Sequence, residues 1–316
     1  MMLTFRSIVY HITMQTILGA NGVIAQELSK HLPRYTNRVR QVSRNPKKVN
    51  DTDELMSADL LKYDQTEKAV AGSEVTYLTA GLPYNIKVWK DQWPQVMRNV
   101  IDACKKHNSK LVFFDNVYSY GLVRGAMTES TPYNPNSKKG EVRAQIATTL
   151  MDEAKAGNLN AMIVRAADFY GPGAKLSLTY STVTEKLKAN KGPQWIGDPK
   201  TIHTFTYTPD AGRSVAVLGN DTSAYNQVWH ALTSKEKITG EGYVKLACEL
   251  SGRPYKLSSL PKFGVRVIGW FVPVLGEFVE MMYQFENDYV FDSSKFEEAY
   301  PEKATSYRDG IAATLK

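Results

Sequence analysis

The fold of this chain is decided by Thr16-Ile17-Leu18-Gly19-Ala20-Asn21-Gly22-Val23-Ile24-Ala25. An apolar run ends at Gly19, and small residues follow at Gly22 and Ala25, which is typical of a buried strand, a tight turn and a helix packed closely on a sheet. A glycine at the helix start lets backbone N–H groups approach a phosphate. The stretch therefore predicts a nucleotide-binding turn made by Gly19, Asn21, Gly22, Val23 and Ile24. Its Gly-x-x-Gly-x-x-Ala spacing differs from the commonest fingerprint, Gly-x-Gly-x-x-Gly.

The composition is typical of a globular enzyme. The chain has 316 residues, of which 43% are hydrophobic and 22% charged, and it shows no repeat or low-complexity tract. Cys104 and Cys248 lie far apart without metal-ligand spacing, so we expect buried free thiols in a reducing, cytoplasmic compartment. The five histidines do not cluster with one another or with carboxylates, and we expect no metal.

Charge and hydropathy patterns argue against two classes of partner. The net charge of +7 is spread along the chain in single residues and pairs, so we expect no nucleic-acid partner. The apolar stretch 263–285 is interrupted by Arg266, Glu277 and Glu280, which favours buried or lid-like helices over a membrane span and predicts no membrane partner. Residues 1–13 carry no small-residue cleavage site and are predicted to be an extension.

Strand-like and helix-like segments alternate along the first half of the chain. Strands are expected at 15–18, 39–43, 75–78, 111–114 and 161–164, and helices at 22–32, 92–107 and 139–156. This alternation predicts an α/β fold, a Rossmann-like doubly wound parallel sheet with a ligand over the carboxyl ends of the strands. We expect a nucleotide-binding domain over 14–172, with a return segment near 204–225. A smaller substrate lobe is expected over most of 173–316, including 226–232.

Residues at the predicted strand ends indicate which nucleotide binds. Ser43 and Arg44 follow the second strand, where a guanidinium suits the extra phosphate of NADP, so NADP is favoured over NAD. The alternative is that Arg44 is an ordinary surface arginine before a turn. Asp59, followed by Leu60, is placed to accept a hydrogen bond from adenine. The small residues Thr79, Ala80 and Gly81 leave room for a ribose and its diphosphate.

Four motifs in order make the chain resemble the extended short-chain dehydrogenase/reductase superfamily, also called the NAD-dependent epimerase/dehydratase family. They are Gly19-x-x-Gly22-x-x-Ala25, Asp59-Leu60, Phe113-Phe114-Asp115-Asn116-Val117-Tyr118-Ser119-Tyr120-Gly121 and Arg165-Ala166-Ala167-Asp168-Phe169-Tyr170-Gly171-Pro172. The resemblance covers about residues 14–220. It implies hydride transfer between a nicotinamide and a carbon that bears a hydroxyl or carbonyl group.

The chain departs from the family at the residues expected to move the proton. Asn116 stands where relatives carry Ser or Thr, and Lys139-x-x-x-Arg143 replaces the Tyr-x-x-x-Lys pair. By resemblance, Arg143 would hold the nicotinamide ribose. A cationic Lys139 has no evident role as general acid unless burial and its neighbour lower its pKa. These changes put the usual mechanism in doubt.

Two further residues are candidates for proton transfer. Asp168 replaces the Asn that contacts the substrate diphosphate in sugar-nucleotide enzymes, and its carboxylate would repel a diphosphate. We expect it to pair with Lys139 or Arg143, or else to transfer the proton itself. Tyr118 could replace the missing phenol, whereas Tyr120 is expected in the core.

Three functions remain open from the sequence. The first is an NADP(H)-dependent oxidoreductase for a small carbonyl or alcohol, with Asn116 orienting the oxygen and Tyr118, Lys139 or Asp168 handling the proton. The second is an NADP-binding regulator without catalysis, and the third is a sugar-nucleotide epimerase or dehydratase. A homodimer through 92–107 and 139–156 is implied by resemblance only.

Overall fold

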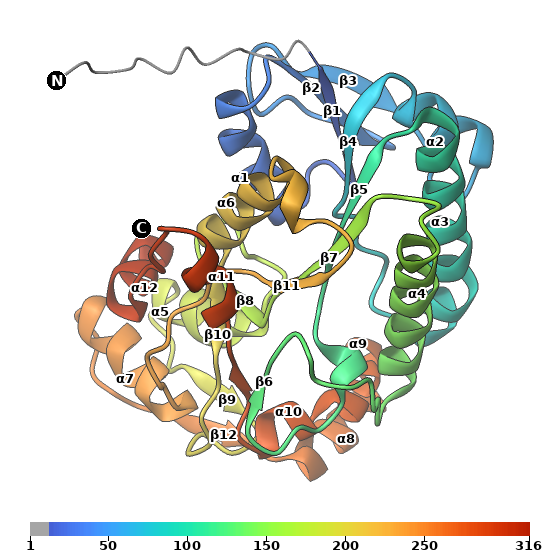
Figure 1. The fold of residues 1–316 in the computed structure, drawn as a ribbon. Helices are drawn as coiled ribbons and strands as arrows, with labels where there is room; N and C mark the ends of the chain where they lie inside the picture. Colours follow the sequence, from blue (N-terminus) through green and yellow to red (C-terminus); the bar gives the residue numbers. More distant parts are fainter. Residues whose placement is uncertain (1–12) are drawn as a thin grey trace, which may run out of the picture.

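A seven-stranded parallel sheet forms the centre of the molecule in a computed structural model that describes residues 13–316 (Figure 1). The strand order is β11-β7-β5-β4-β1-β2-β3, and every neighbouring pair is parallel. The strands are β1 (Met14–Leu18), β2 (Arg38–Ser43), β3 (Glu54–Ser57), β4 (Ser73–Leu78), β5 (Lys110–Asp115), β7 (Ala161–Arg165) and β11 (Val228–His230). The predicted Rossmann-like sheet is confirmed; of the predicted extension, residues 1–12 lie outside the described residues.

Helices cover both faces of this sheet, as the crossovers between parallel strands require. One face packs against α2 (Tyr63–Val70), α3 (Ile86–His107) and α4 (Lys138–Lys155). The other packs against α1 (Val23–His31) and α6 (Thr208–Gly219). Helices α1 and α6 approach closely because Gly212 has no side chain: a Cβ there would lie 2.5 Å from the Cβ of Glu27.

The position of β11 corrects one expectation. The sequence placed 226–232 in the smaller lobe, but Val228, Trp229 and His230 pair with Ile163, Val164 and Arg165 and extend the main sheet. A strand of three residues is too short to show a period of two, so its pattern could not be distinguished from that of a loop.

A smaller lobe lies beside the carboxyl ends of the sheet strands (Figure 1). It holds three two-stranded parallel pairs: β8 (Asp168–Tyr170) with β10 (Phe205–Tyr207), β9 (Gln194–Ile196) with β12 (Ser258–Leu260), and β6 (Ala126–Met127) with β13 (Val290–Phe291). Its helices are α5 (Glu185–Lys188), α7 (Gly240–Leu250), α8 (Lys262–Gly269), α9 (Pro273–Phe278), α10 (Tyr283–Glu286) and α12 (Tyr307–Leu315), while α11 (Ser294–Ala299) packs against β11 of the main sheet.

Short helical turns complete the chain: η1 (Leu32–Arg34), η2 (Tyr118–Tyr120), η3 (Tyr180–Thr184), η4 (Thr222–Ala224) and η5 (Val279–Met281). The apolar stretch 263–285 is thus divided among α8, α9, η5 and α10. Across residues 13–316, no helix has both the length and the hydropathy needed to span a bilayer. Cys104 and Cys248 are buried free thiols.

Buried His230 is expected to make stability depend on pH. Its Nδ1 donates to the Asp292 carbonyl oxygen at 2.6 Å, and its Nε2 accepts from the Tyr120 hydroxyl at 2.9 Å. Burial, with Arg165 nearby, lowers the pKa of His230 to about 3, although the Asp292 carbonyl opposes the shift. The unfolded chain, with a histidine pKa near 6.5, therefore binds more protons between these values, so stability falls as the pH drops below about 6.5.

We expect His230 to contribute a loss of about 2 kcal/mol in unfolding free energy between pH 7 and pH 5. Urea unfolding at both pH values would measure this loss in the wild type and in His230→Gln. The variant should lose less stability than the wild type. Equal losses in the two proteins would contradict the assignment.

Candidate active site

The turn after β1 lies at the carboxyl ends of β1 and β4. We call residues 19–24 of this turn the cradle. Gly19 adopts φ +103°, and a Cβ at this position would lie 2.4 Å from the Cα of Ala80. Only glycine fits both the backbone angle and this close contact. The turn therefore brings Gly19 against the small residues that follow β4, Thr79, Ala80 and Gly81.

The start of α1 offers backbone donors to a ligand. Gly22 is the N-cap residue, and no side chain caps the first turn, where Val23 and Ile24 lie. Such a turn presents N–H groups and the positive end of the helix dipole to an anion. Asn21 has φ 78°, and its side chain fastens the turn to the loop after β2. Its Nδ2 donates to the Asn45 carbonyl at 2.7 Å, and its Oδ1 accepts from the Lys47 N–H at 3.0 Å.

Two cations line a hollow beside this cradle. An open hollow of about 500 Å³ follows β2 and is lined by Arg44, Asn45, Pro46, Lys47, Leu55 and Ser57. Arg44 and Lys47 are exposed, and Ser43 lies at the carboxyl end of β2 within 3.4 Å of Asn21 Nδ2. The predicted cofactor residues of the second strand thus lie next to those of the first.

The remaining predicted cofactor residues flank the same edge. Asp59 is half-buried and its Oδ1 accepts from the Leu61 N–H at 3.1 Å. Leu60 packs against the core beneath α2 and α3. Thr79 is held by its N–H, which donates to the Leu18 carbonyl at 2.9 Å. Gly81 is exposed, and a Cβ there would meet nothing within 4 Å.

A buried ion cluster lies at the carboxyl end of β5, beneath the candidate site. Asp115 ends β5 and accepts from Arg143 at 2.6 Å through Oδ1 and from Arg165 at 3.3 Å through Oδ2. All three side chains are almost fully buried. Arg143, predicted to hold the ribose, is directed at Asp115, and its guanidinium lies over the ring of Trp93 at 4.5 Å.

Lys139, which stands where relatives have tyrosine, is fully buried and ion-paired with two glutamates. Its Nζ donates to Glu277 Oε2 at 2.6 Å, Glu280 Oε1 at 2.9 Å and the Glu277 carbonyl at 2.9 Å. The same glutamates accept from the first N–H groups of two helices: Glu277 from Ile86 of α3 at 3.0 Å, and Glu280 from Lys138 of α4 at 2.8 Å. All three ammonium protons of Lys139 are therefore engaged.

Asp168 pairs with a histidine, contrary to the expected pairing with Lys139 or Arg143. Its Oδ2 accepts from His203 Nε2 at 2.9 Å. His203 is fully buried and stacks between Phe285 and Tyr289, with ring centroids 4.5 and 4.4 Å away. The expectation was wrong because Glu277 and Glu280 reach Lys139 from the lobe, and Asp115 reaches Arg143 from β5.

Tyrosines surround the Asp168 carboxylate. Burial, followed by the charge of Asp168, raises the pKa of Tyr118 and of Tyr289. The pKa of Tyr84 and of Tyr283 is also raised, mainly by burial, with smaller contributions from Tyr118 and then Asp168. Among residues 13–316, the buried hydroxyls of Tyr84, Tyr283 and Tyr289 lack a partner with hydrogen-bond geometry. The Tyr84 hydroxyl nevertheless lies near that of Tyr118, and the Tyr289 hydroxyl lies near the Asp168 backbone.

The Asn116 loop completes the site. Asn116 Oδ1 accepts from the Tyr118 N–H at 3.0 Å, and the Tyr118 ring stacks on Trp89 with centroids 6.3 Å apart. Tyr118 is half-buried, whereas Tyr120 is in the core as expected, with 1% of its surface exposed. Asn116, Tyr118 and Asp168 therefore share one region, and Lys139 and Arg143 lie behind it in ion clusters.

Several residues of the site were missed from the sequence. His203 is a lone histidine before a short strand and gave no signal. Glu277 and Glu280 lie three positions apart, on one side of a helical segment, and this spacing is a signal for a shared partner. In the sequence these charges argued only against a membrane span. Within residues 13–316, no three His, Cys, Asp or Glu side chains are arranged to hold a metal ion.

Comparisons with known proteins agree with this architecture. The model of the NAD dependent epimerase/dehydratase family matches residues 16–227. Short-chain dehydrogenase/reductase family 42E member 1 of Danio rerio is 23% identical over 293 residues, which cover 85% of this chain and 71% of the relative.

Solved structures share the fold. UDP-glucuronic acid 4-epimerase from Bacillus cereus, in complex with UDP-glucuronic acid and NAD, superposes with a TM-score of 0.79 at 19% identity and covers 96% of this chain and 98% of its own. A dTDP-glucose 4,6-dehydratase from Streptomyces venezuelae gives a TM-score of 0.77 at 15% identity and covers 96% of each chain. At these identities the likeness concerns the fold.

Proposed function

Since this chain belongs to the NAD dependent epimerase/dehydratase family, we propose that it is an NADP(H)-dependent oxidoreductase that reduces a small, uncharged carbonyl substrate. The observation that carries the proposal is the grouping of Tyr118, Asp168 and His203 beside Asn116, in the segments that follow β5 and β7. This grouping places a phenol near a carboxylate that a buried imidazole holds.

The residues of the cradle fit a dinucleotide. The backbone N–H groups of Val23 and Ile24 would bind the diphosphate, and the close contact of Gly19 with Ala80 leaves no side chain in its path. The B. cereus relative contains NAD. Here Arg44 and Lys47 line the hollow after β2, so we assign the 2′-phosphate of NADP to them. When bound, NADPH supplies the hydride.

Tyr118 is our proposed proton donor. All three protons of Lys139 are engaged by carboxylate and carbonyl oxygens, so this ammonium is not free to donate. Burial and Asp168 raise the pKa of Tyr118, so its phenol is protonated in the resting site and gives up that proton only to a strong base, such as the alkoxide that develops from the carbonyl group. Tyr118 would donate its phenolic proton to the carbonyl oxygen as negative charge develops there, and solvent would restore that proton. The NH₂ group of Asn116 orients the carbonyl oxygen, since its amide oxygen already accepts from Tyr118.

The charges around the substrate favour an uncharged molecule. Asp168 contributes a carboxylate that is 28% exposed, while Lys139 is opposed by both Glu277 and Glu280. A substrate diphosphate near Asp168 would be repelled by a few kcal/mol, on the order expected for close like charges near a protein surface. Sugar nucleotides, such as the UDP-glucuronic acid bound by the B. cereus epimerase, are therefore disfavoured here.

A second candidate is an NADP-binding regulator without turnover. The observation that favours it is the state of Lys139, which occupies the family tyrosine position yet is buried in an ion cluster. A panel of ketones and aldehydes with NADPH separates the two functions. An oxidoreductase consumes NADPH with at least one carbonyl compound, whereas a regulator binds NADPH and consumes none.

Loss of either Arg44 or Lys47 is expected to weaken NADPH binding about tenfold, because each would lose a charge-assisted contact with the 2′-phosphate. NADH affinity should stay unchanged in Arg44→Ala and Lys47→Ala. Titration by nicotinamide fluorescence measures both affinities. Lys48→Ala is the matched control, since Lys48 is exposed nearby but donates to the Asp51 carbonyl at 2.7 Å. Equal loss for NADPH and NADH would overturn the assignment of the phosphate.

A further inference from the structure

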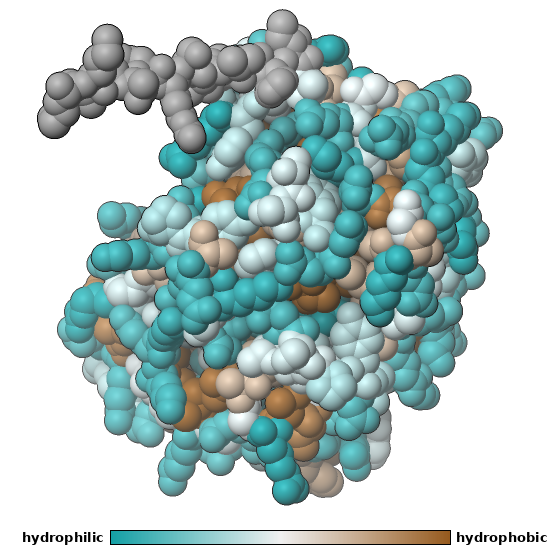
Figure 2. Space-filling view, viewed as in Figure 1, coloured by the Kyte–Doolittle hydropathy of each residue, from teal (hydrophilic) through white to brown (hydrophobic). Residues whose placement is uncertain are grey.

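Large apolar side chains are exposed on α8, α9 and the turn between them, residues 262–278, which we call the helix hairpin. Phe263 is 76% exposed, Trp270 77% and Phe271 81%, and Ile268, Val272 and Val274 are also exposed. Figure 2 shows hydrophobic groups gathered at the lower edge of the molecule, in the region that Figure 1 labels β12, α10 and α8. A cluster of this kind marks an interaction surface.

The hairpin is built as a compact unit. A Cβ on Gly269 would lie 2.8 Å from the Cα of Gly276, so the two helices meet backbone to backbone. Val265 is fully buried and packs with Ile196 and Met282, which attaches the hairpin to the lobe. The buried face is therefore small, and the aromatic residues of the turn face outward.

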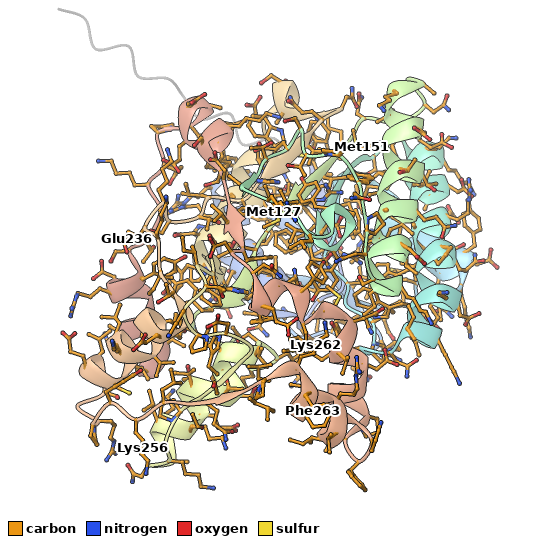
Figure 3. All side chains as sticks on the ribbon, turned by 90° about the horizontal axis from the view of Figure 1, so that it is seen from below. Met127, Met151, Glu236, Lys256, Lys262 and Phe263 are labelled. Atoms are coloured by element: carbon orange, nitrogen blue, oxygen red, sulfur yellow. The ribbon has the colours of Figure 1, made fainter. Side chains whose placement is uncertain are left out.

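The sequence around the hairpin is basic. Residues 251–276 contain Arg253, Lys256, Lys262 and Arg266 and no Asp or Glu. Lys262 pairs with Glu286 at 3.3 Å. In the part of the chain that the structure describes, Arg253, Lys256 and Arg266 form no ion pair. Figure 3 shows Lys256 and Phe263 both toward the lower edge of that view, well separated from each other.

We propose that the helix hairpin docks on the surface of a lipid bilayer that contains anionic lipids. Trp and Phe side chains insert at the level of the headgroups, while Lys and Arg beside them contact lipid phosphates and carboxylates. The sequence predicts no membrane partner because no segment is suited to span a bilayer. Docking on the surface needs no span, only the exposed aromatic residues and cations seen here.

The charges around the hairpin favour an anionic bilayer over a second copy of the chain as its partner. In a symmetric dimer the same surface meets itself, so Arg266 of each hairpin, with Arg253 and Lys256 of the preceding segment, would approach the like charges of the other copy. An anionic bilayer instead complements both the cations and the apolar side chains. Trp270 and Phe271, both highly exposed in the turn, are also suited to insertion among lipid headgroups.

The test uses the purified full chain with vesicles of phosphatidylcholine alone or with about 30% phosphatidylserine, in sedimentation assays. We expect binding to the anionic vesicles that weakens as salt is added, and a blue shift of tryptophan emission. Trp270→Ser/Phe271→Ser should weaken binding about tenfold or more, because the inserting side chains are lost. Lys256→Glu/Arg266→Glu should abolish the preference for anionic vesicles.

Tyr63→Ser is the matched control, since Tyr63 is an exposed aromatic residue at the start of α2, away from α8 and α9 (Figure 1). Circular dichroism should show an unchanged fold in every variant because all the substituted side chains are at the surface. Failure of the wild type to bind either vesicle would overturn the proposal and point to an acidic protein surface instead. Self-association that Trp270→Ser/Phe271→Ser abolishes, without vesicle binding, would also overturn it and identify a second copy as the partner.

Discussion

Asp115→Ala is expected to lower the free energy of unfolding by about 3–5 kcal/mol, the cost of leaving buried charges without their partner. Asp115 is the shared counter-ion of Arg143 and Arg165, and all three side chains are almost fully buried. Without the carboxylate, two guanidinium groups would remain close together in the interior. Urea unfolding at pH 7 measures the change.

Asp115→Asn separates the loss of charge from the loss of volume, because it keeps the size of the side chain. We expect it to be nearly as destabilising as the alanine variant. Asp152→Ala provides the control, since Asp152 is exposed on α4 and should change stability by less than about 0.5 kcal/mol. A loss of unfolding free energy below about 1 kcal/mol in both Asp115 variants would show that the ion cluster does not stabilise the fold.

Tyr118→Phe is expected to lower kcat/KM for carbonyl reduction about 100-fold or more, the usual contribution of a positioned general acid. The substitution removes one oxygen and keeps the stack on Trp89, so the fold and NADPH affinity should be unchanged. Steady-state kinetics with the best compound of the carbonyl panel measures the effect. The loss should appear in kcat, since the proton moves only as the reaction proceeds.

Two companion variants test the assignment of the proton donor. Tyr255→Phe removes a phenol that is exposed and bonded to Glu241, and it should leave kcat unchanged. Asp168→Asn should alter the pH profile of kcat, because the charge beside Tyr118 and the partner of His203 are both lost. Full turnover by Tyr118→Phe would exclude the phenol and return the choice to Asp168.

The sheet and the nucleotide cradle could be predicted because their signals are local. Gly19 and Gly22 lie three positions apart, and the strand and the helix they join follow directly in sequence. Short apolar runs alternating with amphipathic segments then allow only a parallel sheet with helical crossovers. β11 was missed because three residues carry too little pattern.

The ion partners of the site could not be predicted because they are distant in sequence. Glu277 and Glu280 lie 138 and 141 positions from Lys139, and His203 lies 35 positions from Asp168. Nothing in the spacing of a single sequence says which carboxylate reaches which cation. The sequence did place Asn116, Tyr118 and Asp168 together, because each follows a strand that ends at the same edge of the sheet.

Glu277 and Glu280 connect the helix hairpin to α3, α4 and Lys139, and we call this pair of carboxylates the latch. Glu277 closes the helix hairpin and Glu280 follows it, and together they cap α3 and α4 and neutralise Lys139. Any displacement of the hairpin that moves these carboxylates uncovers a buried ammonium and two helix ends. If a vesicle bound at the hairpin shifts this latch and changes substrate affinity, linkage requires that substrate changes the affinity of the hairpin for the vesicle by the same factor.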